Sequence, residues 1–369
     1  MANDLDGLLV VSLEQAVAAP YCSRLLREAG ARVIKLERPE GDFARNYDDV
    51  LSGDSAYFVW LNSGKESIIV DLKCQKDVSL LNNLIKKADV FIQNLRPGAV
   101  ERLGFGYEAV QKLNSSLIMC SISGYGSEGT YSKMKAYDAL IQAETGLCSV
   151  TGPPGEPSKV GASIVDISTG LTAYGEILKK LIKRTTNNGK GTHIQLSLFE
   201  VLSEWLSVPL AYFEYGDKLL GGTGMDHGQI CPYGAYNAKD GKIFVVVQNH
   251  NEWVRLCKQV LRKPDLATDP LYRSNMKRIE NRTALRQEIE VIFKAFTREE
   301  LTNSLQKAEV ACGSINDLQD LSTHDALQRK QVKSSGNKFS LIRRVGDDNQ
   351  LLTVPDLGED SDKIRNEFS

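Results

Sequence analysis

The sequence has few of the residues that build metal centres and disulfide frameworks. It contains only four histidines in 369 residues, which argues against a histidine-based metal site. Its seven cysteines are odd in number, widely scattered and never spaced as C-x-x-C, so neither a zinc site nor a disulfide framework is indicated. We therefore expect no metal, and reduced thiols in a cytoplasmic protein.

Strong net charge and long apolar runs are lacking as well. A formal net charge of −2 gives no overall field that would attract nucleic acid or an anionic membrane. No apolar stretch approaches the ~18 residues of a membrane span. The start, MANDLDGLLVV, places acidic residues before a short apolar run, which is typical of a first strand and not of a signal peptide. We expect neither nucleic acid nor membrane as a partner.

What the sequence does contain is typical of a globular enzyme, with 42% hydrophobic and 25% charged residues. Strand-like and helix-like segments alternate along the first two hundred residues. Short apolar runs predict strands at 8–13, 32–37, 67–72, 90–93, 117–121 and 192–198. Helical spacing predicts helices at about 20–29, around 78–85 and from Asp166 onward. This alternation predicts an α/β fold with a Rossmann-like, doubly wound parallel sheet.

The second half of the chain changes character and predicts a second domain. A glycine-dense stretch precedes a strand at 242–247, and helices dominate around 251–261, 282–296 and 298–308. We predict a large domain over 1–200, completed by 320–369. A linker over 201–224 leads to a small α+β domain over 225–315.

A strand, a helix and a second strand ending in Glu37 suggest a dinucleotide site, but the necessary glycines are missing. The turn from Ser12 to Cys22 reads SLEQAVAAPYC, with no glycine to let a pyrophosphate approach the backbone. A Rossmann-like sheet is therefore expected without binding of NAD.

Asp166 is the first candidate functional residue, and two interpretations are open. An aspartate at the start of a helix most often caps it, with its carboxylate accepting from the first free backbone N–H groups. The same position, beside a turn, can instead leave a carboxylate partly desolvated and reachable, as a nucleophile must be.

Basic residues near the ends of the predicted strands form a second candidate group. Any one of them could be a solvated surface residue. Together they follow strands of an open α/β sheet, where ligands of this class bind, and paired cations suit a phosphorylated ligand. The group comprises Arg38, Lys73, Arg96, Arg102 and Lys135.

The glycine-dense stretch from Gly221 to Gly228 has two interpretations, as a moving segment or as an ordinary connection between domains. His227 within it can be an idle surface residue. His193 lies on a predicted strand, where packing is a better interpretation than ligation.

These same segments resemble the class III coenzyme A transferases, a family that includes formyl-CoA transferase, dicarboxylate CoA transferases and alpha-methylacyl-CoA racemase. The likeness covers most of the first 200 residues and returns more faintly at GGTGMDHG (221–228) and VACGSIND (310–317). Its main stretches are AVAAPYCSRLLREAGARVIKLERPEGDFAR (16–45), NSGKESIIVDLK (62–73), NLRPGAVERLGFGYEAVQKLN (94–114), SISGYG (121–126), AYDALIQAETGL (136–147) and VGASIVDISTGLTAYGEIL (160–178).

The resemblance implies that Asp166 is the acylated aspartate of the family, and so favours the nucleophile over the cap. The implied reaction passes through a mixed anhydride and an aspartyl-CoA thioester and needs no metal or redox cofactor, with coenzyme A as substrate and product. An interlocked homodimer is implied as well. A loop matching Gly221, Gly222, Gly224 and Gly228 would close over the aspartate.

The resemblance also implies a set of coenzyme-binding positions, with the cations among them facing the CoA phosphates. They are Val17, Ala18, Arg38, Val70, Asp71, Leu72, Lys73, Asn94, Leu95, Arg96, Arg102, Lys135, Ala136, Tyr137 and Asp138.

Tyr137 separates two branches of the family. It occupies the position where the racemase branch has a histidine base, and a tyrosine is a poor base for an α-proton at neutral pH. We therefore expect a transferase and not a racemase. The resemblance implies that it acts on an acyl-CoA and a small carboxylic acid, such as a short dicarboxylate. An acyl-CoA racemase, an intramolecular CoA transferase and a non-enzymatic acyl-CoA-binding protein are the alternatives.

Overall fold

The computed structural model describes residues 3–347 and 350–369, which divide into two compact units. The larger unit comprises Met1–Leu147, Lys159–Leu210 and Gln328–Ser369, and the smaller comprises Cys148–Ser158 and Ala211–Leu327. The predicted boundaries differ from this division, because 148–158 and 320–327 were expected in the large domain and lie in the smaller unit, and the expected linker is divided between the two units. The expected linker over 201–224 is largely helical, in α9 (Leu198–Trp205) and α10 (Ser207–Gly216).

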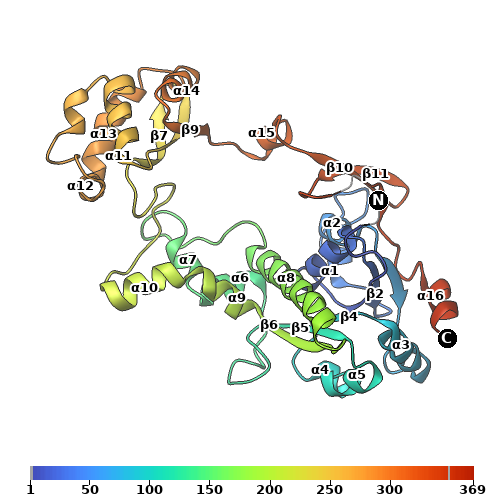
Figure 1. Ribbon diagram of the computed structural model, residues 1–369. Helices are drawn as coiled ribbons and strands as arrows, with labels where there is room; N and C mark the ends of the chain where they lie inside the picture. The colour runs from blue at the N-terminus through green and yellow to red at the C-terminus, as the bar shows by residue number, and fades with distance from the viewer. Residues whose placement is uncertain (1–2, 348–349) are drawn as a thin grey trace. The chain divides into compact units, whose positions relative to one another are not determined.

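A six-stranded sheet organises the larger unit, in the order β3-β2-β1-β4-β5-β6 (Figure 1). Every neighbouring pair runs parallel, as the alternation of strands and helices predicted. The strands are rich in Val, Ile and Leu because helices cover both faces of such a sheet. Their bounds are β1 Leu9–Leu13, β2 Arg32–Glu37, β3 Glu66–Ile69, β4 Val90–Gln93, β5 Ile118–Ser123 and β6 Thr192–Ser197. The predicted doubly wound α/β fold is confirmed.

The strand order reverses between β1 and β4, and this reversal locates the site. The chain builds outward from β1 to β3 and then returns to the other side of β1 with β4. The connecting loops therefore diverge at the carboxyl ends of β1 and β4, and an open α/β sheet binds its ligands in the crevice made there.

Helices form two separate cores with the two faces of the sheet. On one face α1 (Ala18–Glu28) and the 23-residue α8 (Ile164–Thr186) pack on Val10, Ile92 and Ile118. On the other, α3 (Gln75–Lys87), α5 (Tyr107–Leu113) and α16 (Ser361–Phe368) pack on Phe91 and Met119. The remaining helices of this unit are η1 Phe43–Asn46, α2 Ala56–Asn62, α4 Ala99–Arg102 and α6 Asp138–Glu144, followed by α7 Leu147–Val150 at its boundary.

The polar tail from Lys333 gave no prediction of secondary structure, but this end of the chain forms a small second sheet in the order β11-β10-β12. The strands are β10 Arg329–Ser334, β11 Asn337–Ile342 and β12 Leu352–Thr353. Val332 and Val354 pack against Phe58 and Val59 of α2, so this segment completes the larger unit.

The smaller unit is an antiparallel sheet with helices around it (Figure 1). Its strands, in the order β7-β8-β9, are Tyr233–Ala238, Gly241–Val246 and Ala311–Ser314. Trp253, Leu285 and Phe293 are fully buried in its core. Its helices are α11 His250–Arg255, η2 Leu256–Val260, η3 Pro264–Ala267, α12 Asn275–Glu280, α13 Arg282–Phe293, α14 Arg298–Lys307 and α15 Leu318–Ser322.

Close contact between α1 and α8 depends on one glycine. A Cβ at Gly170 would lie 2.5 Å from the carbonyl oxygen of Ala18 and 3.0 Å from the Cβ of Tyr21. Only a residue without a side chain allows the two helices to approach this closely. Gly175, five residues along the same helix, has no heavy atom within 4 Å of its Cβ position.

We predict opposite effects for alanine at these two positions. Gly170→Ala must push α1 away from α8 and should lower the free energy of unfolding by about 1–3 kcal/mol. Gly175→Ala meets no neighbour and should raise it by up to about 1 kcal/mol, through helix propensity. Urea unfolding of both variants measures the difference, and equal effects at the two glycines would contradict the packing described.

Candidate active site

A cavity of about 450 Å³ opens at the strand reversal, between the loops that follow β1, β2, β4 and β5. It brings together the proposed nucleophile and most of the positions that the resemblance assigned to coenzyme A. Those lining it are Ala18, Arg38, Asn94, Leu95, Arg96, Lys135, Ala136, Tyr137, Asp138 and Asp166.

The other six assigned positions do not line this cavity. Val17 is buried just before α1, and Val70 is buried under the end of β3 with Leu72 packed nearby. Asp71, Lys73 and Arg102 are exposed. Their assignment to coenzyme A stays a prediction.

Asp166 lies in the first turn of α8 and does not cap it. The helix begins at Ile164, with Ser163 at the N-cap position and no side-chain cap from that residue. The capping interpretation of Asp166 is therefore wrong. The helix was predicted from Asp166 onward, two residues after its actual start.

Asp138 performs the capping instead. Its Oδ2 accepts from the backbone N–H groups of Val165, at 2.8 Å, and of Asp166, at 3.1 Å. Its Oδ1 accepts from Gln142 Nε2 at 2.6 Å, and Gln142 Oε1 accepts from Val160 N at 2.8 Å. Asp138 thus ties the start of α6 to the start of α8 and satisfies two of the free helix amides.

Because Asp138 takes these amides, the carboxylate of Asp166 is left available. Within residues 3–347 and 350–369, no residue donates a hydrogen bond to it. Burial, together with the negative charge of Asp138, raises the pKa of Asp166 from 3.8 to about 7. A carboxylate that is costly to ionise, unpaired and open to a cavity has the properties of an activated nucleophile.

Aromatic side chains beside Asp166 are the part of the site that the sequence did not reveal. Tyr47 and Phe43 line the cavity. Tyr47 packs edge-to-face against Tyr57, with ring centroids 5.6 Å apart. Burial and the nearby charges of Asp42 and Asp166 raise the pKa of Tyr47 to about 12. Phe43 begins the short η1 and Tyr47 directly follows it, in a segment too irregular for periodicity to give a signal.

The glycine segment 221–228 belongs to the smaller unit. Gly222 N donates to Ser149 O at 3.1 Å, and Gly224 N donates to Gly152 O at 2.7 Å. A Cβ at Gly222 would lie 2.4 Å from Gly152 O, whereas Gly221 and Gly228 have open space. The segment is thus held at its middle, and its expected movement stays a prediction.

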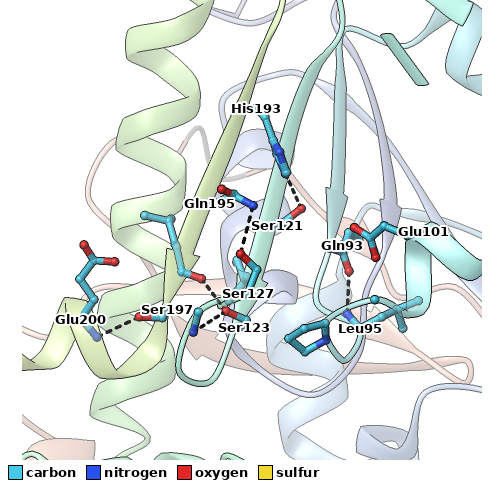
Figure 2. A pocket seen from close by; sticks show the side chains of 15 residues that line it. Gln93, Leu95, Glu101, Ser121, Ser123, Ser127, His193, Gln195, Ser197 and Glu200 are labelled. Carbon is cyan, nitrogen blue, oxygen red and sulfur yellow. Dashed lines mark hydrogen bonds between the residues drawn. The ribbon is translucent and has the colours of Figure 1, made fainter. Parts of the chain in front are cut away.

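A second cavity, of about 130 Å³, lies against the ends of β4, β5 and β6 (Figure 2). His193 Nε2 lies 2.8 Å from Ser121 Oγ there, and its ring stacks on Tyr107, with centroids 4.8 Å apart. His193 therefore packs, as expected. Glu101 and Glu200 line this cavity, and no lysine or arginine is among its described lining residues, so an anionic ligand would be repelled from it.

The described part of the chain gives no sign of a metal centre or a membrane span. No group of three or more metal-ligating side chains gathers within it. None of its helices is both long and apolar enough to cross a bilayer.

The raised pKa of Asp166 predicts a pH dependence of stability. The folded protein holds this proton more tightly than the unfolded chain, so the contribution to stability is present below pH 3.8 and is lost as pH rises to about 7. Asp166→Asn should therefore match the wild type near pH 4 and be about 2–4 kcal/mol more stable at pH 8. Urea unfolding at several pH values tests this, and a gain independent of pH would contradict it.

Comparison with known proteins agrees with this geometry. The CoA-transferase family III profile matches residues 5–340. The chain is 32% identical to the acetyl-CoA:oxalate CoA-transferase of Acetobacter aceti, over 99% of this chain and 95% of that protein. It is 35% identical to the succinyl-CoA:glutarate CoA-transferase of Homo sapiens, over 86% and 73%.

Solved structures give the same result. A CAIB/BAIF family protein from Brucella suis superposes with a TM-score of 0.84, at 33% identity and full coverage of both chains. The fold is shared with Rv3272 from Mycobacterium tuberculosis, with a TM-score of 0.86 at 24% identity, over 100% of this chain and 99% of that one. The resemblance found in the sequence motifs is confirmed, and the chain belongs to CoA-transferase family III.

Proposed function

We propose that this CoA-transferase moves coenzyme A from an acyl-CoA donor to a short dicarboxylic acid, with Asp166 as the covalent nucleophile. The observation that carries the proposal is the carboxylate of Asp166, to which no residue in 3–347 or 350–369 donates a hydrogen bond, in a cavity also lined by Arg38, Arg96 and Lys135. Named relatives act on oxalate and glutarate, and a third, from Haloarcula hispanica, acts on mesaconate. These names support a dicarboxylate as the acceptor.

In the proposed reaction, the Asp166 carboxylate attacks the thioester carbonyl of the donor. A C–O bond forms, the C–S bond breaks, and CoA leaves as a thiolate, so that a mixed anhydride remains on Asp166. The thiolate then attacks the aspartyl carbonyl, which releases the donor acid and leaves an aspartyl-CoA thioester.

The acceptor carboxylate attacks that thioester to form a second anhydride, and CoA thiolate attacks the acceptor's carbonyl. The new acyl-CoA departs and the Asp166 carboxylate is restored. Charges balance at every step without a metal or redox cofactor, so we propose that none is required.

Three cations of the cavity are proposed to hold the coenzyme phosphates. Arg38, Arg96 and Lys135 are all exposed. Arg38 Nε donates to Gly41 O at 3.1 Å and lies 3.9 Å from the carboxylate of Glu40, and its other guanidinium N–H groups can form charge-assisted hydrogen bonds to phosphate. The glycine segment 221–228 is proposed to cover the acylated aspartate, since an anhydride must be shielded from water.

Transfer, and not racemisation, is supported by Tyr137. It lines the cavity beside Asp138, where a racemase of this family has its histidine. A phenol does not remove an α-proton efficiently at neutral pH. Asp166 also provides the carboxylate that transfer requires.

The central prediction compares two variants in steady-state kinetics. Wild type with succinyl-CoA and a panel of short dicarboxylates should yield a new acyl-CoA, detected by mass spectrometry. Asp166→Asn removes the nucleophile and should lower kcat on the order of 10³-fold or more. Arg38→Ala removes a phosphate contact and should raise KM for the donor by about tenfold, with kcat little changed.

Two results would overturn the proposal. One is rapid uptake of deuterium at the α-carbon of a chiral 2-methylacyl-CoA without any CoA transfer, which would indicate a racemase. The other is tight binding of acyl-CoA by a folded protein that shows neither reaction, which would indicate a binding protein.

A homodimer is proposed as the working form, and α10 supports it. This helix reads SVPLAYFEYG, and none of its residues is buried. Phe213 is 53% and Tyr215 is 87% exposed. A ten-residue helix this apolar is not stable in water by itself, and a second copy of the chain would cover it.

We therefore predict a particle of twice the 40.8 kDa chain mass in sedimentation equilibrium. Phe213→Ser combined with Tyr215→Ser should weaken the association, because these side chains would lie in the interface. A wild-type mass of one chain at micromolar concentration would contradict the dimer.

A further inference from the structure

One wall of the active-site cavity is formed by a backbone turn in an unfavourable conformation. Gln15 and Ala16, between β1 and α1, both line the cavity. Ala16 has a φ of 65°, in the left-handed region that is unfavourable for a residue with a side chain. Such a conformation persists only where its surroundings impose it.

Two side chains impose this conformation. Asn94 pairs with the backbone of Gln15 in both directions: Oδ1 accepts from Gln15 N at 3.0 Å, and Nδ2 donates to Gln15 O at 2.8 Å. Asp42 Oδ1 accepts from Ala16 N at 3.0 Å, and the same oxygen accepts from Ala44 N, also at 3.0 Å. The turn is thereby held from the strand side by Asn94 and from the loop after β2 by Asp42.

Asp42 is itself held by a buried network of charges. Its Oδ2 accepts from Lys35 Nζ at 2.8 Å, and Lys35 also lies 3.5 Å from Glu14 Oε1. Glu14 accepts from Lys65 Nζ at 2.7 Å. The side chains of Lys35, Glu14 and Lys65 are 0% exposed.

None of these four charged residues lines the cavity, so none can contact a substrate there. Burying charge is costly, and the arrangement is stable only because each group has an opposite partner. Burial disfavours the ionised form of Glu14, but the charges of Lys65 and Lys35 outweigh it and lower the pKa of Glu14 to about 2. Glu14 therefore stays ionised near neutral pH, whereas burial lowers the pKa of Lys65 to about 8.

The turn is connected to the catalytic helix through α1. Ala18, two residues after Ala16, lines the cavity, and its carbonyl oxygen is the atom that packs against Gly170 of α8. A shift of the turn would therefore move both the cavity wall and the helix that carries Asp166. Misplacement of about 1 Å at such a wall can lower the rate about 10²-fold.

We propose that Asp42 is a positioning residue for the transfer reaction: anchored by buried Lys35, it holds the Gln15–Ala16 turn in the shape that the cavity needs. The effect on catalysis rests on the proposed function, whereas the restraint on the turn does not. Steady-state kinetics therefore test the first claim, and amide hydrogen exchange at Ala16 tests the second.

Asp42→Ala removes the acceptor for Ala16 N. We expect kcat to fall about 100-fold with a smaller change in KM, and exchange at the Ala16 amide to accelerate at least tenfold. Lys330→Met is the matched control. Lys330 is a buried lysine paired with Glu28 at 2.7 Å, at the opposite end of α1. The Lys330→Met variant should be less stable than the wild type, with kcat and the slow amide exchange at Ala16 both unchanged.

A pair of double variants separates the hydrogen bond from the ion pair. Asp42→Asn with Lys35→Met keeps an oxygen for Ala16 N and removes the ammonium that would face the amide NH₂. This variant should recover most of the lost kcat and the slow exchange. Asp42→Ala with Lys35→Met has lost the same ion pair but offers no acceptor, and it should remain impaired.

Equal activity in the two double variants would overturn the inference. So would a folded Asp42→Ala enzyme with wild-type kcat, or with unchanged exchange at Ala16. An inactive wild type would instead defeat the proposed function, and the exchange comparison would still test the turn.

Discussion

The hydrogen bonds from the first turn of α8 to Asp138 are the interaction on which the rest of the site depends. The amides of Val165 and Asp166 both donate to one oxygen of Asp138. A helix start needs such an acceptor, and it is commonly supplied by a side chain next to the helix itself. Here the acceptor comes from α6, so the carboxylate of Asp166 is not needed to cap its own helix. The negative charge that caps the helix also lies beside Asp166, so the same contact that fixes the nucleophile makes its ionisation costly.

The larger unit contains a buried carboxylate, Glu14, and a half-buried one, Asp166, and the contrast between their surroundings explains their roles. Glu14 is paired with Lys65 and Lys35, and its pKa is lowered to about 2, so it remains ionised and inert. Asp166 has a carboxylate as its charged neighbour, and burial with this charge raises its pKa to about 7. A carboxylate paired with a cation stabilises the surrounding structure, whereas a carboxylate without such a partner is available to form a bond. Glu14 belongs to the buried charge network that anchors Asp42 at the Gln15–Ala16 turn. Asp166 lines the cavity that this turn borders.

Much of the fold could be predicted from the sequence, because local patterns mark it clearly. The strands 32–37 and 90–93 were predicted with the bounds that the structure shows, since each is a short apolar run with a helix before it. Gly30 ends the first helix with a φ of 107°, as a glycine in that place suggests. The three strands after residue 328 were missed, because polar and apolar residues alternate there only briefly.

The site was predicted less completely, for a physical reason. Asp166 and its cation neighbours lie in recognisable motifs, but the contact from Asp138 joins residues 28 apart, and no local pattern records it. The packing of Tyr47 against Tyr57 and the hydrogen bond from Ala16 N to Asp42 are likewise contacts between separate segments of the chain. Val70, Leu72 and Arg102 matched the family by position, yet only the folded sheet shows that they lie outside the cavity.

Covalent catalysis by Asp166 is tested most directly by the mass of the peptide that contains this residue, after brief reaction with an acyl-CoA donor. The enzyme is mixed with succinyl-CoA without acceptor and quenched, and one portion is treated with hydroxylamine before digestion. We predict an acylated or CoA-linked Asp166 that hydroxylamine converts to a hydroxamate, and no adduct in Asp166→Asn. An Asp166→Asn enzyme that transfers CoA at the wild-type rate, with no adduct on the wild-type peptide, would contradict this prediction.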